Sequence, residues 1–538
     1  MTDGLITSAH SRRVFLRNLA LLGATTAAPL AWPGMGFGQE TPRAGGVLTL
    51  VTSGDPPNFD PFSNTSSFVL HICAACYNSL LMMDPDDPTR IVGDLATGWT
   101  QSEDGLTYTF TLVQNAKFHD GVPLTAADVK YTFDIVRAPP EGVVSSRKAL
   151  LSAIERIDVV DDYTVNFVLS RPSPGLIASL ATGWFVVAPK HVLEVKGTMA
   201  EDVIGSGPFK FREFIPGTSY SMDRNPDYHV AGRPFLDGLT YYIVPDAGTR
   251  LAYLRTGQID LYDGISGKDA RAMAAELPDA VTVYSANSYI GDPFTMNSAR
   301  APFDNINVRK AMALAVDHAE SLRVLMQDDG VVGGHLVPGH WGMSAEDLAK
   351  MPGYGPDIEA NRAEARRLLA EAGFPNGFET TLTARKAAGT HEDRALFLAD
   401  QFAKIGVTAK LQVQESAVYF ETMNNRQFDV ATNVISALSD DPDFLIGPFH
   451  TTDGSLNYSG VSVPEIDELF ALQTQETDPA KRLELARQLE VATMNAFGTV
   501  VLYYKGKFVV TSSRVRGYVM HPEPDNNRRY QNVWLADS

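Results

Sequence analysis

A chain of 538 residues is too long to fold around one hydrophobic core, because single cores stop growing near ~250 to 300 residues, so two or more lobes are expected. Its composition, 44% hydrophobic and 20% charged residues, is that of a soluble globular protein. A formal net charge of −19 repels phosphate backbones and anionic lipids, which argues against nucleic-acid binding and a basic membrane-surface role.

The N-terminus predicts an export signal. Two adjacent arginines stand in the segment SRRVFLR at 11–17, and a weakly apolar run rich in alanine, threonine and glycine covers 19–30. This order is typical of a twin-arginine signal peptide, and the alternative is a chance basic start. A small-residue pattern at 36–38 predicts cleavage there, so the signal spans residues 1–38 and the mature chain begins at Gln39.

The two cysteines, Cys73 and Cys76, form the pattern CAAC. Neither lies near the signal, so we expect no covalent lipid anchor. Three interpretations of the pair stay open: two small thiols in a helix core, a local disulfide in an oxidising compartment, or redox or metal chemistry. No segment after the signal offers the ~18 consecutive apolar residues that a spanning helix requires, so a soluble mature protein is predicted.

The first part of the mature chain reads as sheet-rich. Alternating apolar and polar residues predict strands at 46–52 and 106–112 and a pair of strands within 157–169. The first of these strands runs into a turn-rich polar segment at 54–61, which is suited to line a ligand site. A helix is predicted to begin after Thr125, which is a natural N-cap residue with Asp128 three positions later.

The second part of the chain alternates helices with strands. Helical periodicity covers 305–318, 359–372, 393–405 and 416–425, and strands are predicted at 379–383 and 407–413. This alternation predicts an α/β lobe. The chain shows no internal repeat and no obvious linker, so we expect the lobes to share strands rather than to hang on a tether.

A series of short segments, in order along nearly the whole mature chain, resembles the peptide- and nickel-binding class of bacterial extracellular solute-binding proteins, which contains the dipeptide and oligopeptide receptors. The segments include DLATGWT at 94–100, DGLTYTF at 104–110, FHDG at 118–121, GSGPFK at 205–210, RNPDY at 224–228, GQID at 257–260, VRKA at 308–311, LLAEAGFPNG at 368–377 and Asp441-Pro442.

The resemblance implies an α/β, two-lobed periplasmic binding protein fold of type II-like architecture, with an enlarged first lobe and a hinged ligand cleft. It implies a first lobe of residues 39–289 plus 507–538, which contains an extra subdomain, and a second lobe of residues 290–506. The crossings between the lobes are expected near 289–294 and 503–508. Ligand closes such a cleft through contacts made to both lobes.

Peptide receptors of this class hold the ligand's ammonium group with a carboxylate just upstream of the Asp-Pro pair. In the segment that begins at Ser436, that position is occupied by Leu438. Asp440 is a possible substitute, although an aspartate near a proline is more often a turn former. A ligand without a free amino terminus is therefore an open alternative.

Other ligand-binding candidates follow from the same resemblance. Arg394 stands near the position of a carboxylate-binding arginine, with a solvated surface charge as the alternative. Tyr503 and Tyr504 are adjacent on a strand and point to opposite faces, so one of them is expected to face the cleft. The remaining candidates, each with a core or turn role as the alternative, are Asp55, Asn58, Trp184 and Asn457.

No motif of a hydrolase, a zinc protease or a phosphate-binding loop is present, so no catalytic residue, metal or cofactor is expected. His335 and His340 lie five residues apart in a segment rich in glycine and proline, which favours a cleft loop over a metal site. An exported hydrolase and a role in redox assembly or as a chaperone remain distant alternatives.

The sequence thus predicts a periplasmic receptor that captures a small peptide or peptide-like solute for import. Its expected partners are the ligand, the membrane subunits of an ABC importer and the twin-arginine export machinery. We expect a monomer that binds no nucleic acid. Alternative ligands are an opine, an organic acid, an oligosaccharide, a metal chelate or haem.

Overall fold

The structure is a computed structural model that describes residues 41–64, 66–139, 145–386, 391–522 and 528–536. The chain divides into two units, Met1–Pro42 and Arg43–Ser538, and the fold described below is that of the second unit. The export signal predicted over residues 1–38 lies outside the described residues. Among the described residues, no helix is both long and apolar enough to cross a membrane.

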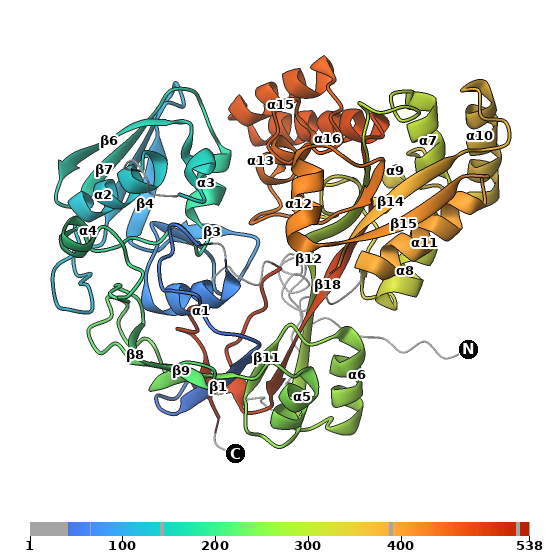
Figure 1. Ribbon diagram of the computed structural model, residues 1–538. Coiled ribbons are helices and arrows are strands. Elements are labelled where there is room, and N and C mark those ends of the chain that lie inside the picture. Colours follow the sequence, from blue (N-terminus) through green and yellow to red (C-terminus); the bar gives the residue numbers. More distant parts are fainter. Residues whose placement is uncertain (1–40, 65, 140–144, 387–390, 523–527, 537–538) are drawn as a thin grey trace, which may run out of the picture. The chain divides into compact units, whose positions relative to one another are not determined.

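One continuous sheet organises the fold, with the strand order β15-β14-β16-β12-β18-β11-β1-β10-β9-β8 (Figure 1). Short strands β13 and β17 pair with β18 and β12 at its side. The strands are β1 (Val47–Thr52), β8 (Phe209–Ile215), β9 (Ser219–Arg224), β10 (Gly238–Ile243), β11 (Leu261–Asp263), β12 (Val281–Met296), β13 (Gly330–Val331), β14 (Glu379–Lys386), β15 (Thr408–Glu415), β16 (Val430–Thr432), β17 (Ile435–Ser436) and β18 (Thr499–Ser512).

The two long strands β12 and β18 connect the two halves of this sheet. They pair antiparallel, and their register is irregular between Asn287 and Gly291 and again between Asp292 and Pro293. At one end β18 pairs with β11, and at the other end β12 pairs with β16 and β17. Such an irregularity interrupts the ladder locally and bends the strand, and here it lies where the strands pass between the lobes.

The first lobe combines its half of the large sheet with a second sheet. The strands of the smaller sheets are β2 (Leu81–Met83), β3 (Ile91–Gly93), β4 (Ala96–Gln101), β5 (Thr107–Leu112), β6 (Ile154–Asp161), β7 (Thr164–Leu169), β19 (Val515–Arg516) and β20 (Trp534–Leu535), with order β4-β5-β7-β6 in the four-stranded sheet. Its helices are α1 (Ser67–Cys76), α2 (Ala126–Arg137), the 3-10 turn η1 (Lys148–Leu151), α3 (Gly175–Leu180), α4 (Lys190–Lys196), α5 (Ala247–Arg255) and α6 (Gly267–Glu276). One hydrophobic cluster joins α1, β1, β10 and the four-stranded sheet, so the extra sheet belongs to the core of the first lobe.

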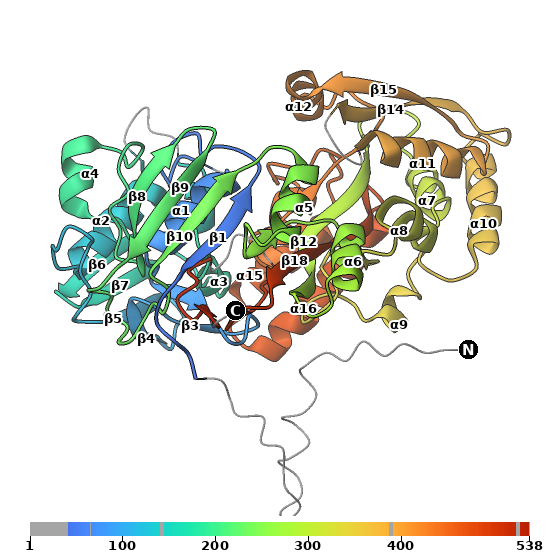
Figure 2. The same ribbon diagram turned by 90° about the horizontal axis from the view of Figure 1, so that it is seen from below.

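The second lobe places helices around β14, β15 and β16, which are parallel to one another (Figure 2). Its helices are α7 (Ile306–Leu314), α8 (His318–Met326), α9 (Ala345–Leu348), α10 (Ile358–Glu371), α11 (His391–Ala403), α12 (Ser416–Asn424), α13 (Pro442–Leu445), α14 (Gly447–His450), α15 (Pro464–Gln475) and α16 (Pro479–Asn495). Its core cluster includes residues of β12 and β18, which therefore contribute to the cores of both lobes.

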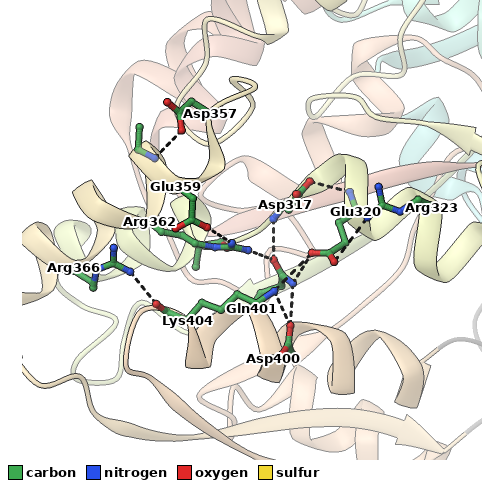
Figure 3. Close-up of polar contacts among 12 residues, drawn as sticks. Asp317, Glu320, Arg323, Asp357, Glu359, Arg362, Arg366, Asp400, Gln401 and Lys404 are labelled. Atoms are coloured by element: carbon green, nitrogen blue, oxygen red, sulfur yellow. Dashed lines mark hydrogen bonds and ion pairs between the residues drawn. The ribbon is translucent and has the colours of Figure 1, made fainter.

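A buried glutamine joins three helices of the second lobe. The amide of Gln401 on α11 accepts hydrogen bonds from the Arg362 guanidinium on α10 at 2.8 Å and from the backbone N–H of Asp317, before α8, at 3.2 Å. It also donates to Glu320 on α8 at 3.1 Å (Figure 3). Because Gln401 is fully buried, these bonds satisfy an amide that would otherwise be costly inside the protein.

Most predicted elements are confirmed, and one helix is divided. Helix α2 begins after Thr125, whose backbone N–H donates to the Asp128 carboxylate at 2.9 Å, as in the predicted capping arrangement. The helix predicted over 305–318 ends at Leu314, and a second helix begins at His318. Asp317 causes this break, because its side chain accepts a hydrogen bond from the N–H of Glu320 and caps α8.

Cys73 and Cys76 are free thiols buried on α1, in agreement with the helix-core interpretation and not with a disulfide. Burial raises the pKa of both thiols, so they remain protonated. The chain after this helix packs unusually close to it. A Cβ atom placed on Gly205 would come within 1.9 Å of the Cys76 carbonyl oxygen, and one on Gly207 within 2.5 Å of the Cys76 carbonyl carbon.

This close approach predicts that a methyl group added at Gly205 greatly destabilises the protein. We expect Gly205→Ala to lower the free energy of unfolding by about 3 kcal/mol or more, because the backbone must shift to relieve the overlap. Chemical denaturation of both proteins measures the difference. Gly98→Ala is the control, since a Cβ at Gly98 meets no atom within 4 Å. Equal stability of the two variants would contradict the described packing.

Candidate ligand-binding site

A cavity of about 490 Å³ lies where the parallel strands of the first lobe end. Strand β1 runs parallel to β10 and β11, so their carboxyl ends share one edge, which is where open α/β sheets bind ligands. We call this space the basic cavity. It is lined by Leu50, Val51, Thr52, Ser53, Ser67, Phe68, His71, Tyr241, Arg250, Leu261, Tyr262, Asp263, Gly264, Ile265, Ser288, Ile290, Lys505, Gly506, Lys507, Phe508, Arg528 and Tyr530.

The basic cavity is named for its charges. Of the described residues that line it, four are lysine or arginine and one is an acid, Asp263. The Asp263 carboxylate forms ion pairs with Lys507 at 3.5 Å and with Arg528 at 2.6 Å. Burial, followed by the charges of Arg528 and Lys507, holds the pKa of His71 well below its usual value, so this histidine is neutral. Among the described residues, the lining of the cavity therefore has more basic than acidic side chains.

A second cavity, of about 610 Å³, is lined by residues of both lobes. Its wall includes Met83 and Ile91 of the first lobe and the segments 337–341 and 438–441 of the second. We call it the acidic cavity, because Asp440 and Asp441 line it and no lysine or arginine does among the described residues. Burial and the charge of Asp441 raise the pKa of Asp440. Asp441 itself accepts two hydrogen bonds from Arg482, at 2.7 and 2.8 Å.

The strand β12 contributes to both cavities. Asn287 and Tyr289 line the acidic cavity, whereas Ser288 and Ile290 line the basic cavity. Alternate residues of a strand point to opposite faces, so the two cavities lie against opposite faces of the strand that connects the lobes. A change in the angle between the lobes would therefore alter both spaces.

Arg394 has internal partners. Its guanidinium is fully buried, forms an ion pair with the equally buried Asp292 at 3.1 Å and donates to the Asn433 carbonyl at 2.6 Å. Lys505, which lines the basic cavity, approaches the other oxygen of Asp292 at 3.3 Å. The arrangement supports a structural role for Arg394 and places Asp292 at the irregular point of β12.

This pair generates a prediction that separates a structural role from a ligand-binding role. We expect Arg394→Met to lower the free energy of unfolding by about 3 to 5 kcal/mol, because it leaves the buried Asp292 short of a counter-charge. Arg367→Met, which removes an exposed surface arginine, should cost less than about 1 kcal/mol. Unchanged stability of Arg394→Met together with weakened ligand binding would show that Arg394 is a ligand-binding arm.

Four other predicted ligand-binding residues have hydrogen bonds or packing contacts within the protein. The Asp55 carboxylate accepts hydrogen bonds from the N–H of Gly217, at 3.0 and 3.1 Å, and the Asn58 side chain accepts one from the N–H of Asp60 at 3.0 Å. The buried Trp184 ring lies 3.7 Å below the Arg147 guanidinium. Asn457 is buried and donates to two backbone carbonyl oxygens. None of these four lines either cavity in the described part of the chain.

The remaining candidates lie near the crossing strands. Leu438 and Asp440 line the acidic cavity, and the exposed Ser436 pairs with Ile290. Tyr503 and Tyr504 are both fully buried, with Tyr503 in the core of the second lobe and Tyr504 in a separate cluster. The two tyrosines thus point to opposite faces as predicted, but neither presents an exposed side chain. Contact of any of these residues with a ligand stays a prediction.

The segment that contains His335 and His340 is a loop at the acidic cavity. His340 lines the cavity, whereas His335 is buried, bonded to the Thr499 carbonyl at 2.9 Å and stacked on His450. In the described part of the chain, no group of three or more histidine, cysteine, aspartate or glutamate side chains is placed to hold a metal ion.

Sequence reasoning missed Lys505, Lys507 and Arg528. The sequence does contain a pattern that marks the first two. Lys505-Gly506-Lys507 lies between the apolar runs VVLYY and FVV of a buried strand. Residues two apart in a strand share a face, so the pattern predicts a pair of cations on one side. Arg528 follows a region outside the described residues, and no local pattern marks it.

Glu490 on α16 holds the loop of the acidic cavity. Its carboxylate is buried and accepts hydrogen bonds from the N–H groups of Leu336 and Met343, each at 3.0 Å. A Cβ on Gly334 would lie 2.4 Å from this carboxylate, so the loop must approach it with a glycine. Burial outweighs the two N–H donors and raises the pKa of Glu490 to about 7.

A raised pKa makes Glu490 a source of pH-dependent stability. Its contribution is fully present below the usual pKa of 4.5 and is lost as the pH rises through about 7, because the folded state binds the proton more tightly. We expect Glu490→Gln to remove a decline of up to roughly 3 kcal/mol in the free energy of unfolding between these pH values. Denaturation at several pH values measures it. An identical pH profile in wild type and Glu490→Gln, or the same change in the exposed Glu484→Gln, would refute the assignment.

Comparisons with known proteins agree with this architecture. Residues 90–457 match the family described as bacterial extracellular solute-binding proteins, family 5 Middle. The chain is 27% identical over 524 residues to the oligopeptide-binding protein AppA of Bacillus subtilis, covering 92% of each chain. It is 25% identical over 517 residues to the glutathione-binding protein GsiB of Pectobacterium atrosepticum, covering 94% of this chain and 96% of that one.

A solved structure shows the same fold. The periplasmic binding protein AgaA from A. tumefaciens R10, in complex with agropinic acid, superposes with a TM-score of 0.74 at 25% identity, covering 92% of this chain and 99% of that one. The match to the family extends over well more than half of the chain. The chain therefore belongs to the bacterial extracellular solute-binding proteins of family 5. Its fold is the two-lobed α/β fold of periplasmic binding proteins, and its class is that of binding proteins.

Proposed function

We propose that the protein is the periplasmic receptor of an ABC importer and captures a small peptide or peptide-like solute between its lobes. The observation that carries this proposal is the crossing of β12 and β18, which is irregular in register and has a cavity against each face. A solute that contacts both lobes stabilises their closed arrangement, and the membrane subunits of the importer then recognise that arrangement.

The lobe boundaries belong to the same proposal. We place the first lobe at 39–289 plus 507–538 and the second at 290–506. The crossings between the lobes then lie near 289–294 and 503–508. In support, β12 and β18 pass through these segments and contribute to the core clusters of both lobes.

A peptide or peptide-like ligand is supported by the names of the relatives, which bind oligopeptides and glutathione. A non-peptide organic acid is the second candidate. It is favoured by Leu438, which stands where an acid would hold a peptide ammonium group, and by the agropinic acid bound to AgaA. Opines, oligosaccharides, metal chelates and haem are further alternatives.

We further propose export through the twin-arginine pathway, a monomeric state, and binding without catalysis or a cofactor. The export proposal rests on the arginine pair and the weakly apolar run of the N-terminal sequence. The non-catalytic proposal is supported by membership of a family of binding proteins. A distant alternative is an exported hydrolase.

Native mass spectrometry of the freshly isolated protein tests the receptor proposal. We expect one small molecule bound per chain, which unfolding and refolding removes and which rebinds stoichiometrically when it is returned. Incubation with that molecule should leave it chemically unchanged, because a receptor releases the compound that it binds. A protein that carries no small molecule and binds none from a cell extract, or one that converts the molecule, would contradict the proposal.

A further inference from the structure

The two lobes also touch outside the crossing strands, where α3 of the first lobe lies beside α13 of the second (Figure 1). Gly175 is the first residue of α3. A Cβ atom placed on it would lie 2.3 Å from Oδ2 of Asp443 and 3.5 Å from Oδ1 of Asp441. The three atoms nearest to that Cβ all belong to the second lobe. The close approach of the lobes at this point therefore depends on a glycine.

The second lobe holds the carboxylate that faces Gly175. Oδ1 of Asp443 accepts hydrogen bonds from the Gln473 amide at 2.6 Å and from the Thr474 hydroxyl at 2.9 Å. The Arg482 guanidinium lies 3.5 Å from the same oxygen, whereas Oδ2 is the oxygen that faces Gly175. The carboxylate must break these bonds to swing aside. A methyl group at Gly175 would therefore push the lobes apart.

Further contacts between the lobes surround this point. Leu150 of η1 and Ala178 of α3 pack against the core cluster of the second lobe that contains Phe444. On β5, burial raises the pKa of Tyr108 to about 12, and the positive charge of Arg482 in the second lobe opposes that rise. Three elements of the first lobe thus lie against one region of the second.

We use the name latch for Gly175 and Ala178 of α3 together with Asp441 and Asp443 of the second lobe. The latch borders the acidic cavity, because Ala178 and Asp441 line that cavity. Gly175 and Asp443 line neither the acidic nor the basic cavity in the described part of the chain. The latch therefore fixes how closely the walls of the acidic cavity approach, while two of its members stand outside the space of the cavity.

We propose that the latch holds the lobes of the receptor closed, and that Gly175 is a positioning residue that permits this closure. The proposal rests on the receptor role and adds a closing contact that the solute does not touch. When the lobes separate, a side chain at residue 175 moves away from its nearest neighbours, because these belong to the other lobe. A larger side chain there disfavours the closed arrangement alone and shifts the population toward the open one.

Gly175→Ala tests the latch with one methyl group. Alanine suits a helix better than glycine, so the first lobe should lose no stability in thermal unfolding. The matched control is Gly248→Ala in the first turn of α5, where the added Cβ would lie 3.4 Å from its nearest atom, in the Asp246 side chain. Small-angle X-ray scattering of the proteins as isolated should give Gly175→Ala a larger radius of gyration than the control. Adding Asp443→Ala, which removes the overlap, should restore the compact value.

A cross-link tests whether the lobes meet at the latch in solution. A Cβ at Gly175 would lie 3.1 Å from Cγ of Asp443, which is within reach of a disulfide between cysteines at these two positions. In a glutathione buffer, Gly175→Cys with Asp443→Cys should form this disulfide at least tenfold faster than Gly248→Cys with Asp443→Cys. The buried thiols Cys73 and Cys76 are present in both proteins, so the comparison is unaffected by them. Mass spectrometry after alkylation measures the rates.

Equal rates of cross-linking in the two pairs would overturn the proposal, as would equal radii of gyration for Gly175→Ala and its control. A protein that carries a small molecule on isolation but forms no cross-link would keep the receptor role and refute the latch. A protein that forms the cross-link rapidly, carries no small molecule and binds none from a cell extract would support the latch as a contact between lobes and contradict the receptor role.

Discussion

The structure depends on two strands that serve both lobes. Because β12 and β18 lie in one continuous sheet, each lobe is completed by the same pair of strands, and motion between the lobes must be accommodated within that pair. The ladder is irregular between Asn287 and Gly291 and beside Asp292, where fewer regular backbone hydrogen bonds resist bending. The pairing of the two strands is regular on both sides of this place.

The same place carries an electrostatic constraint. Asp292 is fully buried and lies between Arg394 of the second lobe and Lys505 of the crossing strand. A buried carboxylate needs such partners, so the positions of β12, β18 and α11 are coupled. Lys505, one of these partners, also lines the basic cavity. One cluster therefore links α11 of the second lobe, the two crossing strands and the wall of this cavity.

The sequence was a good guide to elements and a weaker guide to the site. Thr125 and Asp128 marked the start of α2 because capping is a local interaction. The alternation of strands and helices over 379–413 indicated an α/β lobe, and the structure pairs β14 and β15 in parallel. Helical periodicity also predicted one helix where the structure has α7 and α8, because periodicity does not detect the N-cap that Asp317 provides. Such errors are confined to one turn of chain.

The surroundings of the candidate site residues are harder to predict, for a different reason. Arg394 was selected by its position along the chain, but its partner Asp292 is about one hundred residues away in sequence, and only the sheet brings the two together. Lys507 and Arg528 likewise contact Asp263, which is far from both along the chain. Burial and charge compensation are properties of the folded chain, so a sequence pattern can indicate which residues are polar without indicating which of them are already paired.

The distance between the lobes tests the central claim most directly. Spin labels at Val195→Cys on α4 and Leu472→Cys on α15 occupy exposed positions, 83% and 57%, while Cys73 and Cys76 are buried and resist labelling. Electron–electron double resonance should show a shorter distance between the labels when the native solute is bound, since closure needs contacts to both lobes. An unchanged distance, with the solute shown to be bound, would contradict a receptor that closes about β12 and β18.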